Sequence, residues 1–421
     1  MNSQIITAYK LLKILSLSGI TDVCYAPGSR SAPLVLALNM LKDRVEISGH
    51  VLFDERSLGF FTLGKHSAEG KKAALFTTSG SAVVNLYPAV QQAANNHQSM
   101  IVITADRPDE LLGCGANQTA SQGEIFGKNA VFLGIGAANR EIESSWLTGK
   151  FLEKYHEALK AGLPLHINIA FREPLYTDAG RDIPLLDKTD AGLETFLSEA
   201  RKRTGEALPS AIPATDTSYL YSARNIKAGT AFKGTFFLNC HLLKLPFLQK
   251  ILNRREKESR NPSVVITDAA LSELSAECLE PEHRVAGTGR GIQIRPFSGK
   301  YGAVAFACGL SSRKHPVIVI LTADNLIKDL SSLILLREYG ITAVILSSND
   351  DLKDDFPDIK IFAAGLGVPF LRFSISYDEA ASGAGSIESA PLTLSPENSI
   401  PDINSSTSEA QIIEYRKVNQ K

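Results

Sequence analysis

The sequence predicts an α/β fold built from parallel, doubly wound sheets. Residues 1–180 alternate short apolar runs with amphipathic segments, and the same alternation resumes at residue 263. The apolar runs are rich in valine and isoleucine and are bounded by glycine, proline or aspartate, as buried strands are. Because strands alternate with helices, we expect parallel sheets that carry helices on both faces.

The first 180 residues are predicted to form one complete domain. Six strands are expected, at 23–27, 50–54, 73–80, 100–108, 130–136 and 164–170, with helices at 6–19, 57–70 and 81–96. In such sheets, ligands bind beyond the carboxyl ends of the strands. A functional site is therefore expected among the strand ends at 27–30, 54–56, 79–81 and 106–108.

The rest of the chain is predicted to form a less regular segment, a second α/β domain and a tail. In residues 181–260, we expect a linker at 204–218, a strand at 235–243 and a helix at 242–260. The second domain, 261–380, should hold strands at 263–268, 292–297, 316–324, 342–350 and 368–376, and helices at 301–310 and 329–340. Residues 381–421 are rich in serine, proline and glycine, which predicts a disordered tail.

Composition excludes several classes of protein. A chain of 421 residues that is 44% hydrophobic supports more than one compact domain. A net charge of −1 argues against a broad nucleic-acid or anionic-membrane surface. The five cysteines form no C-x-x-C pair, which favours buried, reduced thiols over a disulfide framework or a zinc site. With no apolar span and no export signal at the start, we expect a soluble, cytoplasmic protein.

The first candidate motif is APGSRSAP, at 26–33. Glycine and serine make a tight turn there, and the following helix presents its N-terminal N–H groups beside Arg30, which suits an anion. A plain strand-to-helix turn, with a capping serine and a solvated arginine, is an equally good interpretation of this motif alone.

Two further motifs follow the next strands. FDERSLG, at 53–59, places charges at the end of a buried strand, where they are unfavourable unless paired; a surface ion cluster of Asp54 and Arg56 is the alternative. TTSGSAVVNLYPAV, at 77–90, lacks the glycine spacing of a hydrolase elbow around Ser79 and Ser81. A capped helix start is favoured for Ser81.

A long polar stretch, 104–126, follows another buried strand and carries Arg107, Asn117, Gln118 and Gln122. Long polar loops at strand ends are often functional, although a solvated connector remains a fair alternative. The GTGRG run at 287–291 lacks the final glycine of a dinucleotide-binding motif, so a loop is expected there.

Together, these motifs resemble the menaquinone-pathway SEPHCHC synthases, a family of thiamine-diphosphate (ThDP) enzymes. The likeness covers 1–176 in unbroken order, through APGSRSAP, FDERSLG, TTSGSAVVNLYPA, ITADRPDELLGCGANQ and HINIAFREPLY. It implies a ThDP-binding fold with a pyrimidine-binding domain at 1–180, a shortened central domain and linker at 181–260, and a diphosphate-binding domain at 261–380. It also implies a homodimer or dimer of dimers, with active sites built between two chains.

The resemblance further implies a reaction and its residues. The family decarboxylates 2-oxoglutarate and adds the succinyl unit to isochorismate, using ThDP with Mg²⁺ or Mn²⁺. Glu55 matches the carboxyl group that hydrogen-bonds the cofactor's pyrimidine, so that the thiazolium C2 can lose its proton; a dry strand end suits this role. The matching substrate-side residues, suited to dicarboxylates, are Ser29, Arg30, Arg107, Asn117, Gln118 and Arg295.

The cofactor residues implied by the resemblance lie in both halves of the chain. They are Glu55, Ser79, Gly80, Ser298, Gly299, Gly302 and Asp324, with Asp324, Asn349 and Asp350 as metal ligands. Ala323 and Leu352 replace expected glycines, and Ser275 stands where an arginine is expected. Besides a working synthase, these departures leave open two alternatives. One is a weak or inactive homologue that acts as a ligand-binding or regulatory subunit, and the other is a ThDP decarboxylase or carboligase with changed substrates.

Overall fold

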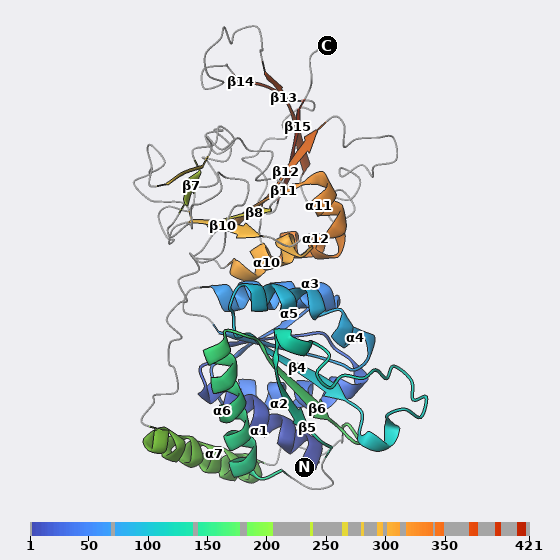
Figure 1. Cartoon of the computed structure of the whole chain (residues 1–421), viewed down its shortest axis with the longest axis vertical. Helices are drawn as coiled ribbons and strands as arrows, with labels where there is room; N and C mark the ends of the chain where they lie inside the picture. The colour runs from blue at the N-terminus through green and yellow to red at the C-terminus, as the bar shows by residue number, and fades with distance from the viewer. Residues whose placement is uncertain are drawn as a thin grey trace. The chain divides into compact units, whose positions relative to one another are not determined.

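The computed structural model forms two compact units, Met1–Thr217 and Ser218–Lys421, and each unit contains a large sheet of its own (Figure 1). The structure describes residues 2–68, 72–137, 142–176, 183–204, 236–238, 263–267, 279–281, 293–297, 301–311, 317–339, 342–348, 370–377, 392–396 and 411–417. Among these residues, no helix combines the length and the apolar character needed to cross a membrane.

The first unit is built on a six-stranded parallel sheet in the order β2-β1-β3-β4-β6-β5. Its strands are β1 Asp22–Tyr25, β2 Ser48–Val51, β3 Ala73–Thr77, β4 Ile101–Asp106, β5 Val131–Ile135 and β6 Leu165–Ala170. All six strands expected from the sequence are confirmed. Because every pair is parallel, the carboxyl ends of all strands lie along one edge of the sheet.

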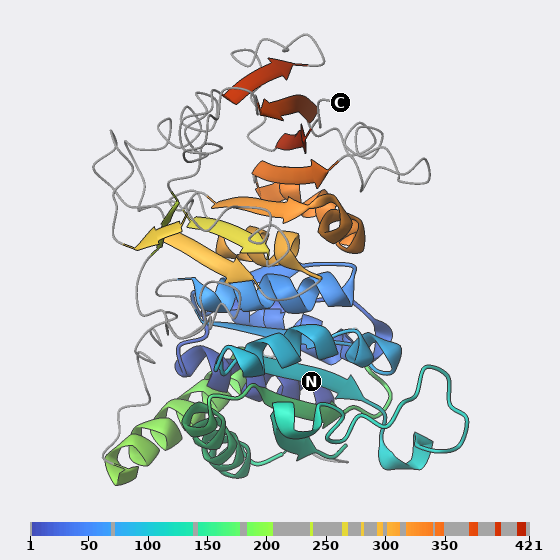
Figure 2. The ribbon, with the colours of Figure 1, turned by 45° about the horizontal axis from the view of Figure 1, so that its top comes forward.

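Helices cover both faces of this sheet, as predicted. α1, α2 and α6 lie on one face, and α3 and α5 lie on the other (Figure 1). The helices are α1 Ser3–Leu17, α2 Ala32–Lys42, α3 Glu55–Ser67, α4 Ser81–Val84, α5 Tyr87–Asn95 and α6 Ser144–Ala161, with short turns η1 Ser29–Ser31, η2 Asp109–Leu111 and η3 Gly127–Asn129. The loop after β4 extends away from the sheet (Figure 2).

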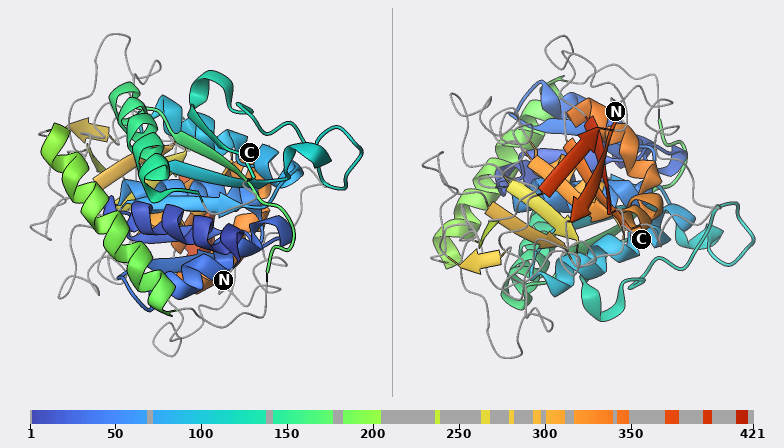
Figure 3. Two further views of the ribbon diagram at one scale, coloured as in Figure 1. Left: turned by 90° about the horizontal axis from the view of Figure 1, so that it is seen from below. Right: turned by 90° about the horizontal axis from the view of Figure 1, so that it is seen from above.

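A further helix, α7 (Ile183–Thr204), packs against α1 and α6 (Figure 3). Leu186, Leu193 and Leu197 are buried, and their spacing of seven and four residues puts them on one face of the helix. The domain boundary predicted from the sequence lies at residue 180 and assigns α7 to a central domain. That boundary is wrong for α7, because the first two of these leucines belong to the core of the first unit.

The second unit contains a seven-stranded sheet in the order β10-β8-β11-β12-β15-β13-β14, in which only the β13–β14 pair is antiparallel. Its strands are β8 Ser263–Thr267, β10 Gln293–Phe297, β11 Val317–Thr322, β12 Thr342–Ser348, β13 Phe370–Tyr377, β14 Leu392–Pro396 and β15 Gln411–Lys417. The expected parallel α/β sheet is thus confirmed except at its β14 edge. A separate antiparallel pair joins β7 Phe236–Leu238 to β9 Leu279–Pro281.

Two strands of this sheet correct the prediction of a disordered tail from residue 381. β14 pairs with β13, and β15 lies between β12 and β13. Both are short runs with alternating apolar residues, LTLSP and QIIEYRK. The overall composition of the tail hides them, because serine, proline and glycine dominate its average.

The described helices of the second unit are α10 Ala303–Leu310, α11 Ala323–Lys328 and α12 Leu333–Tyr339, with the turn η6 Leu330–Ser332. Asp329 is buried and its carboxylate accepts from the backbone N of Val304, at 2.8 Å, and from Ser332 Oγ, at 2.7 Å. This carboxylate therefore holds the start of α10 to η6. The expected linker at 204–218 and helix at 242–260 lie outside the described residues, apart from residue 204.

Candidate functional site

A pocket of about 250 Å³ lies at the strand ends of the first unit. Its lining residues are Pro27, Gly28, Ser29, Arg30, Glu55, Thr78, Ser79, Arg107 and Gln118. The segments that follow strands β1, β2, β3 and β4, including the loop after β4, all contribute to this lining. Six residues that the sequence analysis named separately as site candidates therefore meet in one place: Ser29, Arg30, Glu55, Ser79, Arg107 and Gln118.

The turn after β1 brings Arg30 into the pocket wall. Gly28 permits this close packing, because a Cβ on it would lie 2.4 Å from Cβ of Thr78. Arg30 is only 7% exposed; its Nη1 donates to the carbonyl of Phe171 at 2.9 Å, and its Nη2 lies 3.4 Å from Glu173 Oε1. Its Nε has no partner among the described residues. The interpretation of Arg30 as a solvated residue is therefore wrong.

Arg107 follows β4 and links the other pocket segments. Its Nη1 donates to Ser79 Oγ and, at 2.9 Å, to the carbonyl of Gln118. Gln118 returns a hydrogen bond from Nε2 to the carbonyl of Ser79 at 3.0 Å. Gly80 has φ +76°, and a Cβ there would lie 2.4 Å from the Gln118 carbonyl oxygen, so this contact also requires glycine.

Glu55 reaches the pocket because a helix begins there. Asp54 is the N-cap of α3, and its Oδ1 accepts from the backbone N of Ser57 at 2.7 Å. This cap places Glu55 in the first turn of α3, at the pocket edge. The dry strand end predicted for this residue is wrong, because Glu55 is partly exposed in this structure.

The pocket is electrostatically suited to an anion. Burial, followed by the nearby Arg107 guanidinium, lowers the pKa of Arg30 from its ordinary value. Two guanidinium groups line the pocket, and Glu55 is the one carboxylate among its lining residues. A ligand carboxylate would relieve the repulsion between the two arginines and would accept hydrogen bonds from them.

Behind the pocket lies a group of polar residues, of which the sequence points only to Gln122, in the long polar stretch, and to the strand end that begins at residue 106. They are Thr104, Asp106, Gln122, His166 and Asn168, and they are joined by hydrogen bonds. Burial raises the pKa of Asp106 above its ordinary value. The alternation of His166 and Asn168 in the buried strand HINIA was an available signal, because residues two apart face the same side of a sheet.

The structure gives less support to other predictions in the first unit. Asn117 is exposed and does not line the pocket. Ser81 begins α4 as expected, but the cap position is Gly80, and no side chain caps this helix. Cys24 is buried as expected, whereas Cys114 is exposed, so the expectation of buried thiols is wrong for Cys114.

The candidates in the second unit stay predictions. Gly302 is the N-cap of α10, with φ +83°, while Arg295 lies on β10 and Asp324 lies in α11. Four candidates lie outside the described residues: Ser298, Gly299, Asn349 and Asp350. Within the described ranges, no group of three or more histidine, cysteine, aspartate or glutamate residues is arranged to hold a metal.

Comparison with known proteins finds the similarity in the same part of the chain as the motifs, the N-terminal part. Residues 7–130 match the family model described as "Thiamine pyrophosphate enzyme, N-terminal TPP binding domain". The listed relatives carry the name "2-succinyl-5-enolpyruvyl-6-hydroxy-3-cyclohexene-1-carboxylate synthase", which is SEPHCHC synthase.

Three relatives show the extent of the match. The protein of Mannheimia succiniciproducens is 40% identical over 173 residues, which are 41% of this chain and 30% of the relative. The protein of Vibrio vulnificus is 42% identical over 166 residues, 39% and 29% of the two chains, and that of Cronobacter sakazakii is 44% identical over 181 residues, 43% and 30%. The matched part of the chain thus spans about 30% of the length of these relatives. Residues 7–130 are therefore similar to the N-terminal domain of thiamine pyrophosphate enzymes, and the first unit is similar in sequence to SEPHCHC synthases.

Proposed function

We propose that this chain acts in a ThDP-dependent SEPHCHC synthase of menaquinone biosynthesis, which decarboxylates 2-oxoglutarate and adds the succinyl unit to isochorismate. The observation that carries the proposal is the pocket of the first unit, where two arginines and one glutamate meet at the strand ends. The names and sequence identities of the relatives support the same reaction. A homodimer or dimer of dimers in the cytoplasm is part of the proposal.

In this proposal, Arg30 and Arg107 bind substrate carboxylates. Arg30 is held by the carbonyl of Phe171 and by Glu173, and Arg107 is held by Ser79 and by the carbonyl of Gln118. Both guanidinium groups are thus fixed before a ligand arrives, so little side-chain entropy is lost on binding. Ser29 and Gln118 supply further polar groups of the lining, and Asn117 and Arg295 complete the proposed substrate set.

The pocket also fits one end of the cofactor. Glu55 places a carboxyl group at the pocket edge, where its O–H would donate a hydrogen bond to a ring nitrogen of the pyrimidine. When bound, ThDP supplies a nucleophilic carbon at thiazolium C2. Ser79 and Gly80 would border it, and the second unit of a neighbouring subunit would hold its diphosphate through Ser298, Gly299, Gly302 and Asp324. Mg²⁺ or Mn²⁺ would bind to Asp324, Asn349 and Asp350.

Calorimetric titration with ThDP and Mg²⁺ is the first test. A working synthase should bind the cofactor and release carbon dioxide from 2-oxoglutarate in a reaction that is coupled to isochorismate. The absence of binding at millimolar ThDP would rule out both the synthase and any other ThDP enzyme. Carbon dioxide release that ignores isochorismate would instead indicate a decarboxylase with changed substrates.

Glu55→Gln tests the role of the carboxyl group. Because the amide cannot exchange a proton with the pyrimidine, we expect hydrogen–deuterium exchange at C2 of bound ThDP to slow by about 100-fold or more. Binding of 2-oxoglutarate should change little. Glu153→Gln, the same substitution on the exposed face of α6, is the matched control and should exchange at the wild-type rate. An unchanged exchange rate in Glu55→Gln would refute the assignment.

A further inference from the structure

Behind the pocket wall, a buried amide side chain, Gln122, and a partly buried one, Asn168, connect the segments that form the wall. Gln122, which is 1% exposed, accepts from the backbone N of Gly80 at 2.8 Å through its Oε1. Its Nε2 donates to the carbonyl of Ala105 at 3.2 Å and to Asn168 Oδ1 at 2.9 Å. Asn168 Nδ2 in turn donates to Asp106 Oδ2 at 2.8 Å.

The donor and the acceptor of every hydrogen bond in this network are fixed by the chemistry of its groups. A backbone N–H can only donate, so Gly80 requires the oxygen of Gln122 and leaves its nitrogen for Asn168. Asn168 must then present its oxygen to Gln122 and its nitrogen to Asp106. The Asp106 carboxylate ends the chain and also accepts from the backbone N of Arg107 at 2.7 Å.

This chain of hydrogen bonds joins the three segments whose geometry shapes the pocket. One end holds the Ser79–Gly80 turn, and the other end holds the end of β4, where Arg107 begins. Gln122 itself belongs to the loop that carries Gln118. No residue of the pocket lining contributes its side chain to these hydrogen bonds. The hydrogen-bond network therefore supports the site from behind without occupying it.

We propose that Gln122 and Asn168 are positioning residues that hold Arg107 and the Ser79–Gly80 turn in the geometry that binds a substrate carboxylate. This inference rests on the proposed function, because it needs a carboxylate ligand in the pocket. A buried polar network with fully determined directions tolerates no reversed amide. A displacement of Arg107 of about 1 Å should be enough to weaken binding strongly.

Gln122→Glu tests the direction of these hydrogen bonds, because it leaves the shape of the side chain almost unchanged. The new carboxylate would place an acceptor against the carbonyl of Ala105 and against Asn168 Oδ1. Rotating the Asn168 amide would relieve the second contact but would set its oxygen against the Asp106 carboxylate. Either arrangement needs one additional proton to satisfy the opposed oxygens. The titratable groups close to the new carboxyl group are Asp106, Arg107 and Arg30, and His166 is connected to Asn168 through Thr104.

The measurement is calorimetric binding of 2-oxoglutarate and of isochorismate to the full chain between pH 8 and pH 6. For Gln122→Glu, we expect binding about 10- to 100-fold weaker than wild type at pH 8, with much of the loss recovered at pH 6 as the new carboxyl group takes up its proton. Gln122→Met, which keeps the volume and makes no hydrogen bond, should bind weakly at every pH without recovery. Gln91→Glu, the same substitution at an exposed position of α5, is the matched control.

The possible outcomes separate this inference from the proposed function. If wild type binds neither ligand, the proposed function fails, whatever the variants do. If wild type binds and Gln122→Glu binds equally well at pH 8, the inference is overturned. Should Gln122→Glu fail to fold, Gln122→Met decides, because wild-type affinity in that variant would equally overturn it.

Discussion

His166 shows how a single side chain in the network is constrained. It is 1% exposed, lies between Phe126 and Phe132, and contacts Thr104 Oγ1 through Nε2 at 2.8 Å. Thr104 gives its one hydroxyl proton to Asn168 Oδ1, at 2.7 Å, so it must accept from His166. The Nε2–H tautomer is therefore the one that fits, and the ring is neutral.

Burial lowers the pKa of His166 to about 3, which makes folding stability dependent on pH. In the unfolded chain, the imidazole takes up a proton near pH 6.5, whereas the folded protein does not. The contribution is therefore complete above pH 6.5 and is lost progressively as the pH falls toward 3. Between pH 7.5 and pH 5.0, we expect His166 to reduce the free energy of unfolding by about 2 kcal/mol.

Urea unfolding across this pH range measures the effect. His166→Gln keeps a donor for Thr104 but cannot titrate, so its stability should fall by about 2 kcal/mol less than that of wild type between pH 7.5 and pH 5.0. His97→Asn, at an exposed residue with φ +51°, should retain the wild-type slope. Equal slopes for wild type and His166→Gln would contradict this account.

The pocket residues at the strand ends could be predicted from the sequence. The residues that hold them in place could not. Arg30 and Arg107 follow the buried strands β1 and β4, and Glu55 follows the half-exposed edge strand β2, so their place at one edge follows from the parallel topology. Gln122 and Asn168 act through partners that are 42 and 62 residues away in the chain. Such pairings depend on strand order and register, which a single sequence does not specify.

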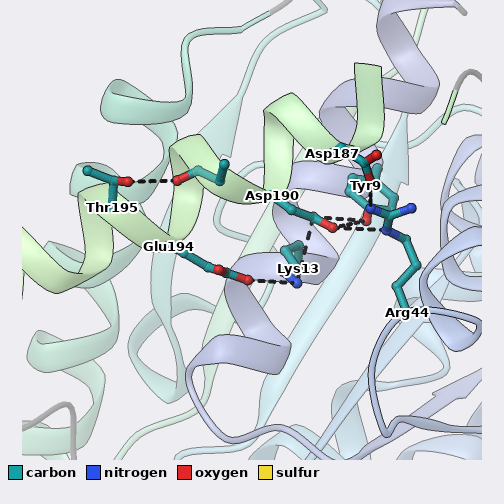
Figure 4. Close-up of polar contacts among 8 residues, drawn as sticks. Tyr9, Lys13, Arg44, Asp187, Asp190, Glu194 and Thr195 are labelled. Atoms are coloured by element: carbon teal, nitrogen blue, oxygen red, sulfur yellow. Dashed lines mark hydrogen bonds and ion pairs between the residues drawn. The ribbon is translucent and has the colours of Figure 1, made fainter. Parts of the chain in front are cut away.

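At the scale of elements, α7 is held by ion pairs as well as by its leucines (Figure 4). Asp190 accepts from Tyr9 Oη at 2.9 Å and from Arg44 Nε at 2.9 Å, and Lys13 Nζ lies 3.7 Å from it. Burial, with the Asp190 carboxylate, raises the pKa of Tyr9, so the phenol stays a donor. One carboxylate of α7 therefore satisfies three groups from α1 and the end of α2.

Asp190→Asn should weaken the attachment of α7. Lys13 would keep its buried position without this counter-charge, and Arg44 would lose one of its two carboxylates. Because the Asp190 side chain is 13% exposed, we expect a loss of about 2–3 kcal/mol in the free energy of unfolding, below the range for fully buried pairs.

Glu194→Gln is the control, because Glu194 also pairs with Lys13 but is 57% exposed. It should change the free energy of unfolding by no more than about 0.5 kcal/mol. Similar losses of unfolding free energy in both variants would show that the burial of Asp190 does not increase its contribution to stability. The sequence offered no sign of this cluster, because charged residues on a helix usually face water.

At the scale of the whole molecule, the core of the first unit runs from Ile6 to Leu193 and includes α7. The last of the family motifs ends earlier, at residue 176, and the domain boundary predicted from these motifs is residue 180. Motif likeness follows the site residues, whereas a domain boundary follows burial. The extent of the core could not be predicted, because the leucines of α7 reveal their partners only in the folded chain.

Two fragments test where the first domain ends. A fragment ending at Thr204 keeps Leu186, Leu193 and Leu197 with their partners, so it should unfold in a single cooperative transition. A fragment ending at residue 180 loses these three side chains, each of which contributes about 1.5–3 kcal/mol when buried. The summed loss is comparable with the whole stability of a typical domain, about 5–15 kcal/mol.

The shorter fragment should therefore unfold at much lower urea concentration or aggregate, since it also exposes the apolar face of α1 and leaves Tyr9 and Lys13 without Asp190. Urea titrations followed by circular dichroism, together with sedimentation, compare the two fragments directly. Equal midpoints would mean that α7 is an accessory helix and that the domain is complete at residue 180. A lower midpoint for the shorter fragment would establish that the fold around the pocket requires α7, a helix that follows the last of the family motifs.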